Sequence, residues 1–154
     1  MIPERMHCLL TQSLIGYLCT ADSKNQPHIT PIFVIYNPET QKIYFQTSRT
    51  SKKVKDIRAN SNVSLTLDNR DPINPFKNEG VQVMGKAEIM EMGLTKAIFE
   101  EGHFPEDVKI TLDIFRSRFA KVLSKEKSAE KVVVKINIGR MVYWRGPKFH
   151  SVTV

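Results

Sequence analysis

Hydroxyl and lysine side chains cluster within residues 45–65, in the run FQTSRTSKKVKDIRANSNVSL. The pattern predicts a β-strand that ends near Thr47, a short turn, and a helix with Ser51 as its N-cap. Lys52 and Lys53 then stand in the first helical turn, where backbone N–H groups lack partners and the helix dipole favours negative charge. This combination predicts an anion site of the kind that holds a phosphate. An ordinary capped surface helix with solvated lysines is the alternative.

Other patterns of catalytic residues are absent from the sequence, and no catalytic residue is identified. It has no G-x-S-x-G, P-loop, G-x-G-x-x-G or H-E-x-x-H motif. Cys8 and Cys19 have no C-x-x-C spacing and the four histidines are scattered, so no metal site is expected. The two cysteines are expected to be reduced thiols in a cytoplasmic protein. If the protein is an enzyme, a bound cofactor should perform the difficult step.

The elements around this cluster are predicted to be mainly β-strands. The length of 154 residues suits one domain, 1–154, in which a helical insertion occupies about 91–124. NPETQ has the composition of a hairpin loop, and Gly85 allows a β-bulge. The antiparallel order predicts a β-barrel with helical additions. Besides a short helix at 3–11 and a second at 51–60, strands are expected at 13–22, 28–36, 42–48, 62–68, 80–90, 131–138 and 140–144.

Charge and hydropathy exclude some classes of protein. The formal net charge is +7, and the basic residues are concentrated in 116–154. Such asymmetry can indicate contact with nucleic acid, but no nucleic-acid-binding motif accompanies it, and solvated helix and strand faces explain it as well. Nucleic acid is therefore not expected to be a partner. No apolar run approaches the roughly 18–20 residues of a membrane span, and the N-terminus is not expected to be a secretory signal.

Four segments, in order, resemble the FMN-binding split barrels of the pyridoxamine 5′-phosphate oxidase superfamily: GYLCTAD…QPHITPIFVIY, IYFQTSRTSKKVKDIRANSNVSL, VQVMGKAE and VYWRG. They extend from Gly16 to Gly146 and leave out the helical insertion. The resemblance implies a mainly β (α+β) fold, an antiparallel split β-barrel. It also implies an FMN-binding oxidoreductase of unidentified substrate and a homodimer with the cofactor at the subunit interface. Related split barrels bind a deazaflavin, which is the nearest alternative cofactor.

The same resemblance implies which residues of this sequence hold the cofactor. The flavin ring and ribityl chain would lie along one strand, and the phosphate would lie at the predicted anion site. Trp144 would approach the flavin, although packing into the core is an alternative role for it. The implied cofactor-binding residues are Thr30, Pro31, Ile32, Phe33, Thr47, Ser51, Lys52, Lys53 and Trp144.

The sequence also departs from the family pattern. Ile35 stands where the true oxidases carry a lysine, Gly80 where they carry a glutamine, and His150 and Val152 where they carry an Arg-x-His pair. The half of the pattern that holds FMN is kept, and the half that recognises pyridoxal phosphate is missing. We therefore do not expect a true pyridoxamine phosphate oxidase. A non-catalytic flavin- or haem-binding protein is the alternative from a different class, with His28 or His150 as the candidate haem ligands.

Overall fold

The computed structural model describes residues 2–91 and 130–154, so the predicted helical insertion lies outside the described residues, apart from Glu91. No helix within the described part is long and apolar enough to cross a membrane. The elements, in chain order, are α1 (Glu4–Gln12), β1 (Ile15–Ala21), β2 (Pro27–Phe33), β3 (Ile35–Asn37), β4 (Lys42–Ser48), α2 (Lys52–Ala59), β5 (Asn62–Asn69), the 3₁₀ turn η1 (Pro75–Lys77), β6 (Glu79–Met90), β7 (Lys131–Arg145) and β8 (Lys148–Thr153).

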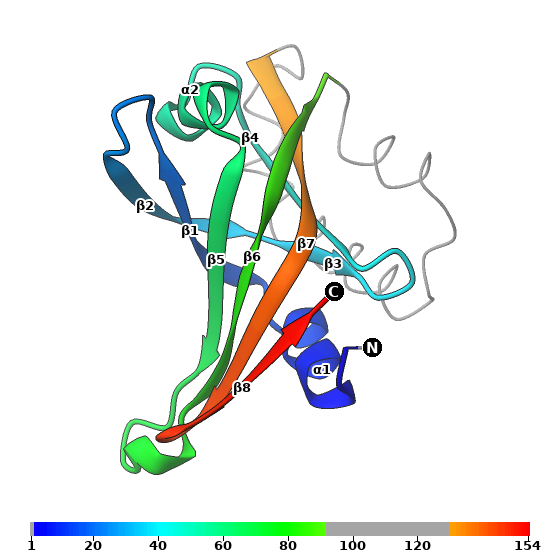
Figure 1. The fold of residues 1–154 in the computed structure, drawn as a ribbon, viewed down its shortest axis with the longest axis vertical. Coiled ribbons are helices and arrows are strands. Elements are labelled where there is room, and N and C mark those ends of the chain that lie inside the picture. Colours follow the sequence, from blue (N-terminus) through cyan, green and yellow to red (C-terminus); the bar gives the residue numbers. More distant parts are fainter. Residues whose placement is uncertain (1, 92–129) are drawn as a thin grey trace, which may run out of the picture.

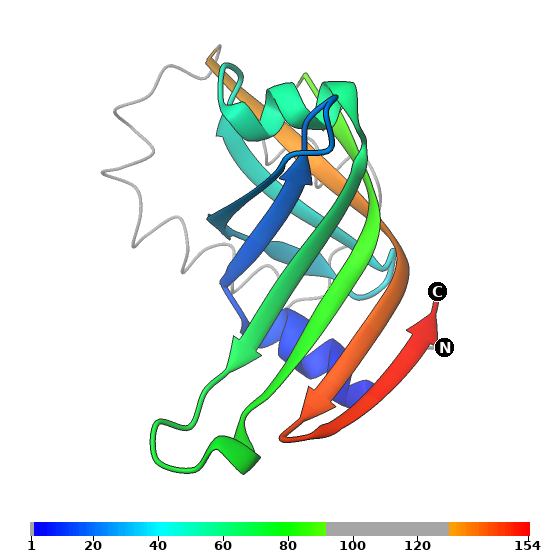
Figure 2. The same ribbon diagram turned by 60° about the vertical axis from the view of Figure 1, so that its left-hand side comes forward.

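The described strands form one curled antiparallel sheet (Figures 1 and 2). Its order is β2-β1-β5-β6-β7-β4-β3, and β8 pairs with β7 beside this path. Strand β7 pairs with β6 along most of its length, with β4 along its first half and with β8 along its second half. Helix α2 lies at one end of the curled sheet and α1 toward the other (Figure 1). This architecture confirms the predicted antiparallel split β-barrel.

The concave side of the sheet carries the apolar core. Leu18, Leu65, Val83 and Met141 stand opposite one another on β1, β5, β6 and β7, and each is at most 1% exposed. Because side chains alternate between the two faces of a strand, their neighbours along each strand point to the convex side. Among the described residues the concave side is therefore filled with side chains, which leaves the rim and the convex face of the sheet open to ligands.

Helix α1 is fixed to the sheet by polar contacts as well as by apolar packing. Met6 and Leu10 are each 1% exposed. Arg5 forms an ion pair with Glu79 at the start of β6, and the Tyr143 hydroxyl donates a hydrogen bond of 3.0 Å to the same carboxylate. Glu79 is only 5% exposed, so it needs both partners to offset the loss of its hydration.

Three of the predicted strands were wrong in their boundaries. The predicted strand 28–36 is divided at Val34, which leaves the β2 ladder and donates its N–H to the carbonyl of Leu14. The predicted strands 131–138 and 140–144 are one strand, β7, because the chain does not turn at Gly139. The register instead shifts there, opposite Met84 and Gly85, in the bulge that Gly85 was expected to allow. The turn comes at Gly146, where φ is +53°, and β8 beyond it was missed.

We expect the two glycines of this bulge to differ sharply in their tolerance of a side chain. A Cβ at Gly85 would overlap the Asn137 carbonyl oxygen, whereas a Cβ at Gly139 would lie 3.6 Å from the carbonyl of Met84, in ordinary contact. Gly85→Ala should therefore lower the free energy of unfolding by about 1–3 kcal/mol. Gly139→Ala should change it by no more than about 0.5 kcal/mol. Denaturant unfolding of both variants tests this, and equal losses would contradict it.

Candidate functional site

The predicted anion cluster forms where β4 ends and α2 begins. Ser51 caps the helix, and its Oγ accepts a hydrogen bond of 3.4 Å from the N–H of Val54. The Thr47 hydroxyl, at the end of β4, donates to the same oxygen over 3.5 Å. The N–H groups of Lys52 and Lys53 have no partner within the helix, because no turn precedes them. The two hydroxyls and the first N–H groups of the helix therefore lie at this end of α2.

The two lysines of the cluster lie in different surroundings. Lys52 Nζ donates a hydrogen bond of 3.0 Å to Asp56 Oδ1, one helical turn further on. Lys53 is half-buried and has no hydrogen-bond or ion-pair partner within residues 2–91 and 130–154. Burial lowers the pKa of the Lys53 ammonium from its ordinary value. An anion beside Lys53 would favour its charged form, so Lys53 is the better cation of the two for holding a ligand.

A buried carboxylate positions this helix, and the sequence reasoning missed it. Asp56 is 1% exposed and accepts a hydrogen bond of 2.8 Å from the Thr20 hydroxyl of β1. The Nδ1 of His28, on β2, lies 3.8 Å from Oδ2, the same carboxylate oxygen that Thr20 bonds. Burial alone would raise the pKa of Asp56, but hydrogen bonds from Lys52 and Thr20 and the nearby charges outweigh it and hold the pKa below its ordinary value. The signal in the sequence was an aspartate four residues after Lys52 in a short amphipathic helix.

The four residues predicted to line the flavin do not share a face of β2. Thr30 and Ile32 stand opposite Leu18 and Gly16 of β1, on the concave side, and Ile32 belongs to the core. Pro31 and Phe33, opposite Tyr17 and Ile15, point to the convex side. A planar ligand along β2 could therefore contact the side chains of only one of these pairs.

Trp144 lies far along the sheet from the anion cluster. Thr47 pairs with Val132 near the start of β7, whereas Trp144 stands near the end of β7 and packs against Gly80. Trp144 comes twelve residues after Val132, which corresponds to about 40 Å of strand at about 3.3 Å per residue. One chain therefore does not bring Trp144 to the anion cluster.

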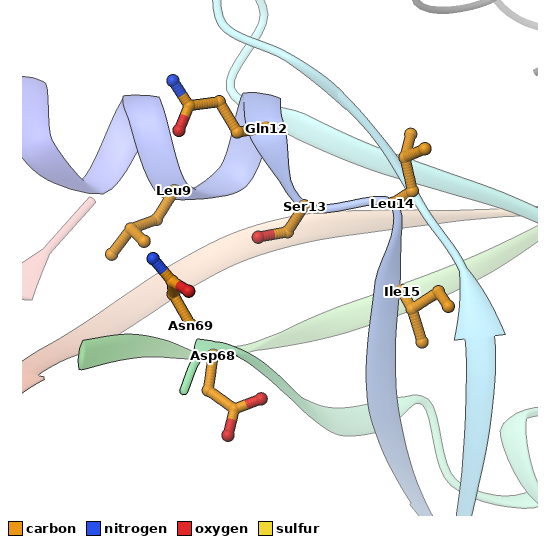
Figure 3. A pocket seen from close by; sticks show the side chains of 7 residues that line it. All are labelled: Leu9, Gln12, Ser13, Leu14, Ile15, Asp68 and Asn69. Atoms are coloured by element: carbon orange, nitrogen blue, oxygen red, sulfur yellow. The ribbon is translucent and has the colours of Figure 1, made fainter. Parts of the chain in front are cut away.

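A hollow of about 470 Å³ opens at the opposite end of β1 from α2, beside the end of α1 (Figure 3). Polar side chains from the end of α1 and the end of β5 line it, and Asp68 forms an ion pair with Arg70. None of the predicted site residues lines this hollow. Its lining residues are Leu9, Gln12, Ser13, Leu14, Ile15, Asp68 and Asn69.

The family model described as pyridoxamine 5′-phosphate oxidase matches residues 2–145 of the sequence. The chain belongs to the pyridoxamine 5′-phosphate oxidase family. A comparison with curated proteins found no match. The family match covers both the anion cluster and Trp144, so the resemblance seen in the sequence motifs is confirmed.

Solved structures similar to this family member share its fold. The General Stress Protein 26 of Bacillus anthracis str. Sterne is 22% identical, with 97% of each chain covered and a TM-score of 0.65. A FAD-binding protein of Mesorhizobium loti is 21% identical, with 92% of each chain covered and a TM-score of 0.65. A haem-binding protein of Mycobacterium smegmatis is 14% identical over 99% of this chain and 59% of its own, with a TM-score of 0.69. At these identities the likeness establishes the fold alone.

We expect Asp56 to stabilise the fold in a pH-dependent way. At neutral pH, Asp56→Asn should lower the free energy of unfolding by about 1–3 kcal/mol, because charged hydrogen bonds to Lys52 and Thr20 are weakened. The folded-state pKa lies below the ordinary value of 3.8, so the stabilisation is fully present above 3.8 and is lost as the pH falls through the folded-state value.

Urea unfolding at several pH values measures this effect. The difference between parent and Asp56→Asn should stay constant from pH 7 to about 5 and shrink below 3.8. The matched control is Glu39→Gln, which neutralises an exposed carboxyl in the turn after β3. A difference that does not change with pH would show that the charge of Asp56 contributes nothing.

Proposed function

We propose that this protein binds FMN, with the phosphate at the start of α2, and that it is a flavin-dependent oxidoreductase of unidentified substrate. The observation that carries the proposal is Lys53, a half-buried ammonium with no partner within the described residues, in the first turn of the helix that Ser51 caps. A phosphate dianion supplies what this cluster lacks, an acceptor for an ammonium and for the first N–H groups of a helix.

The charges around the cluster also fit a phosphate. Asp56, the buried acid of α2, is neutralised by Lys52 and hydrogen-bonded by Thr20, so it repels an incoming anion less than a free carboxylate would. Lys52 contributes positive charge from the same helical turn while it remains bonded to Asp56. We therefore expect Lys53 to bind the phosphate directly and Lys52 to contribute mainly through its charge.

Flavin, when bound, supplies hydride-transfer chemistry that no side-chain set of this chain provides. The roles of the protein's own residues are to hold the phosphate, to orient the ring along β2, and to shield one ring face from water. Ile35 is only 6% exposed and offers no charge where the true oxidases carry a lysine. A phosphorylated pyridine substrate would lose its hydration there without gaining a partner, so we do not propose pyridoxamine phosphate as the substrate.

The proposal includes a homodimer. Side chains on the convex face of β1 and β2 form an apolar surface that water covers in a single chain: Ile15 is 53% exposed, Tyr17 43%, Ile29 66% and Phe33 43%. Cross-strand pairing puts all four on one face, where a second copy could bury them. One chain cannot bring its own Trp144 to a flavin whose phosphate it holds, because the two positions are some 40 Å apart along the strand. In a homodimer, the Trp144 of the second chain could reach that flavin.

The phosphate assignment predicts a selective loss of affinity. Lys53→Ala should weaken FMN binding about tenfold or more, because a charge-assisted hydrogen bond of about 1.5–3 kcal/mol is lost. Riboflavin has no phosphate, so its weaker binding should not change. Lys55→Ala, on the exposed side of the same helix, is the matched control and should bind FMN like the parent. Isothermal titration with both ligands measures the difference.

Two results would contradict this assignment. Equal weakening of FMN and riboflavin would show that Lys53 supports the site without contacting the phosphate. Unchanged FMN affinity would place the phosphate elsewhere.

The visible spectrum of the purified protein separates the cofactors: a flavin spectrum supports the proposal, whereas a deazaflavin spectrum or a Soret band favours one of the alternatives.

The dimer is tested on the apolar face. Light scattering should give about twice the single-chain mass of 17.7 kDa. Ile29→Glu places a charge on the most exposed of the four side chains and should shift the protein toward monomer, because a charge buried without a partner is costly. Ile73→Glu, on a loop residue that is 90% exposed, is the control. A parent protein that stays at 17.7 kDa contradicts the shared site.

A further inference from the structure

The indole ring of Trp144 lies where a side chain at position 80 would otherwise stand. Trp144 points to the convex side of β7, because Met141, three residues earlier, points into the core. Gly80 of β6 is its cross-strand partner, and a Cβ on Gly80 would overlap the indole atoms Cζ2 and Cη2. That Cβ would also lie 2.7 Å from the carbonyl oxygen of Leu67. The missing side chain at residue 80 therefore lets the indole rest on the backbone of β6.

Phe149 extends this aromatic surface onto β8. It stands opposite Trp144, and cross-strand partners project from the same face of a sheet as neighbours. Phe149 is 71% exposed, and Trp144 is half-buried. We call the two side chains, together with Gly80 beneath the indole, the aromatic platform. Such a surface is suited to a flat ring, because aromatic rings attract one another when they are stacked or meet edge to face.

The charges near the aromatic platform are paired or point away from it. Asp68, opposite Gly80 on β5, forms an ion pair with Arg70. Arg145 and Lys148 lie next to the platform along the chain, so strand alternation turns both toward the other face. The neighbouring row of cross-strand partners on the same face is uncharged and consists of Thr66, Gln82, Val142 and Ser151. A charged ligand would therefore lose its hydration here without gaining a partner among the described residues.

We propose that the aromatic platform binds a planar, uncharged ring of the substrate, stacked on Trp144 of one copy and facing the flavin that the second copy holds at α2. The platform itself is present in a single chain, whereas the assignment of its ligand as the flavin's substrate rests on the proposed function. Phe149 contacts the edge of the bound ring. Gly80 is a positioning residue, because it acts only through the place it leaves for the indole.

The sequence contains one tryptophan, so ¹⁵N-labelled protein gives a single indole N–H signal that reports the platform directly. The FMN-loaded protein is titrated with benzamide, benzoate and cyclohexanecarboxamide. Benzamide is planar and uncharged, benzoate carries a charge on the same ring, and cyclohexanecarboxamide keeps the amide on a saturated ring. Benzamide should shift the indole signal in a saturable way. The other two should bind about threefold more weakly or worse, since each lacks one of the two properties that the platform favours.

The flavin is measured separately, so the two proposals can fail independently. FMN affinity comes from isothermal titration, and the addition of FMN should itself move the indole signal. Tight FMN binding without a benzamide shift overturns the inference and leaves the flavin site intact. Benzoate binding as tightly as benzamide also overturns it, as does FMN binding that leaves the indole signal unmoved. A protein that binds no FMN overturns the proposed function, and with it the assignment of the ring as a substrate.

Substitutions test the individual residues of the aromatic platform. Gly80→Ala should displace the indole, which moves its signal before any ligand is added and weakens benzamide binding about threefold or more. Phe149→Ser, at an exposed position, should weaken benzamide binding to a similar extent without affecting folding, and Phe149→Tyr, which keeps the ring, should retain the binding. Ile73→Ser, on an exposed loop residue, is the control and should bind benzamide like the parent. Equal effects of Phe149→Ser and Ile73→Ser overturn the role of Phe149 and the platform with it.

Discussion

The buried carboxylate of Asp56 is the contact on which the arrangement of the anion cluster depends. A carboxylate with 1% exposure is stable only when its oxygens are hydrogen-bonded, and the partners here come from the helix and from β1. Helix α2 is short, and its apolar side offers only Val54 and Ile57 to the core. The polar contact to Thr20 therefore fixes the rotation of the helix and decides which of its two first-turn lysines remains available.

The filled interior of the sheet explains why function is expected at the rim and on the convex face. A small barrel whose concave face is packed with aliphatic side chains has no cavity for a cofactor. The rim at α2 offers N–H groups and hydroxyls, and the convex face offers the bulge and the apolar side of β1 and β2. The long strand β7 connects these regions, because it changes its partner from β4 to β8 on either side of the bulge.

Membership of the pyridoxamine 5′-phosphate oxidase family fits these constraints without fixing the chemistry. Solved relatives with the same fold include proteins described as binding FAD and haem. A scaffold that places its binding groups at the rim can exchange cofactors by changing a few rim residues while the core stays the same.

The sequence by itself determined the elements with strong local signals. The alternation in residues 62–68 predicted β5, and the change of period after Ser51 predicted α2 with its cap, because both depend on neighbouring residues. The bulge at Gly85 could also be anticipated, since a glycine within a long strand has few other uses. The resemblance of four motifs added the fold family, which no single motif determines.

The tertiary structure decided everything that depends on residues distant in sequence. Asp56 acquires Thr20 and His28 as neighbours only when β1 and β2 reach the helix, so no local pattern could distinguish Lys52 from Lys53. The continuity of β7 through Gly139 depends on pairing with β6, whereas local signals favour a break at a glycine. The position of Trp144 over Gly80 and the 40 Å of strand that separate Trp144 from the anion cluster likewise follow from strand register, which is set by the packing of one whole face of the sheet.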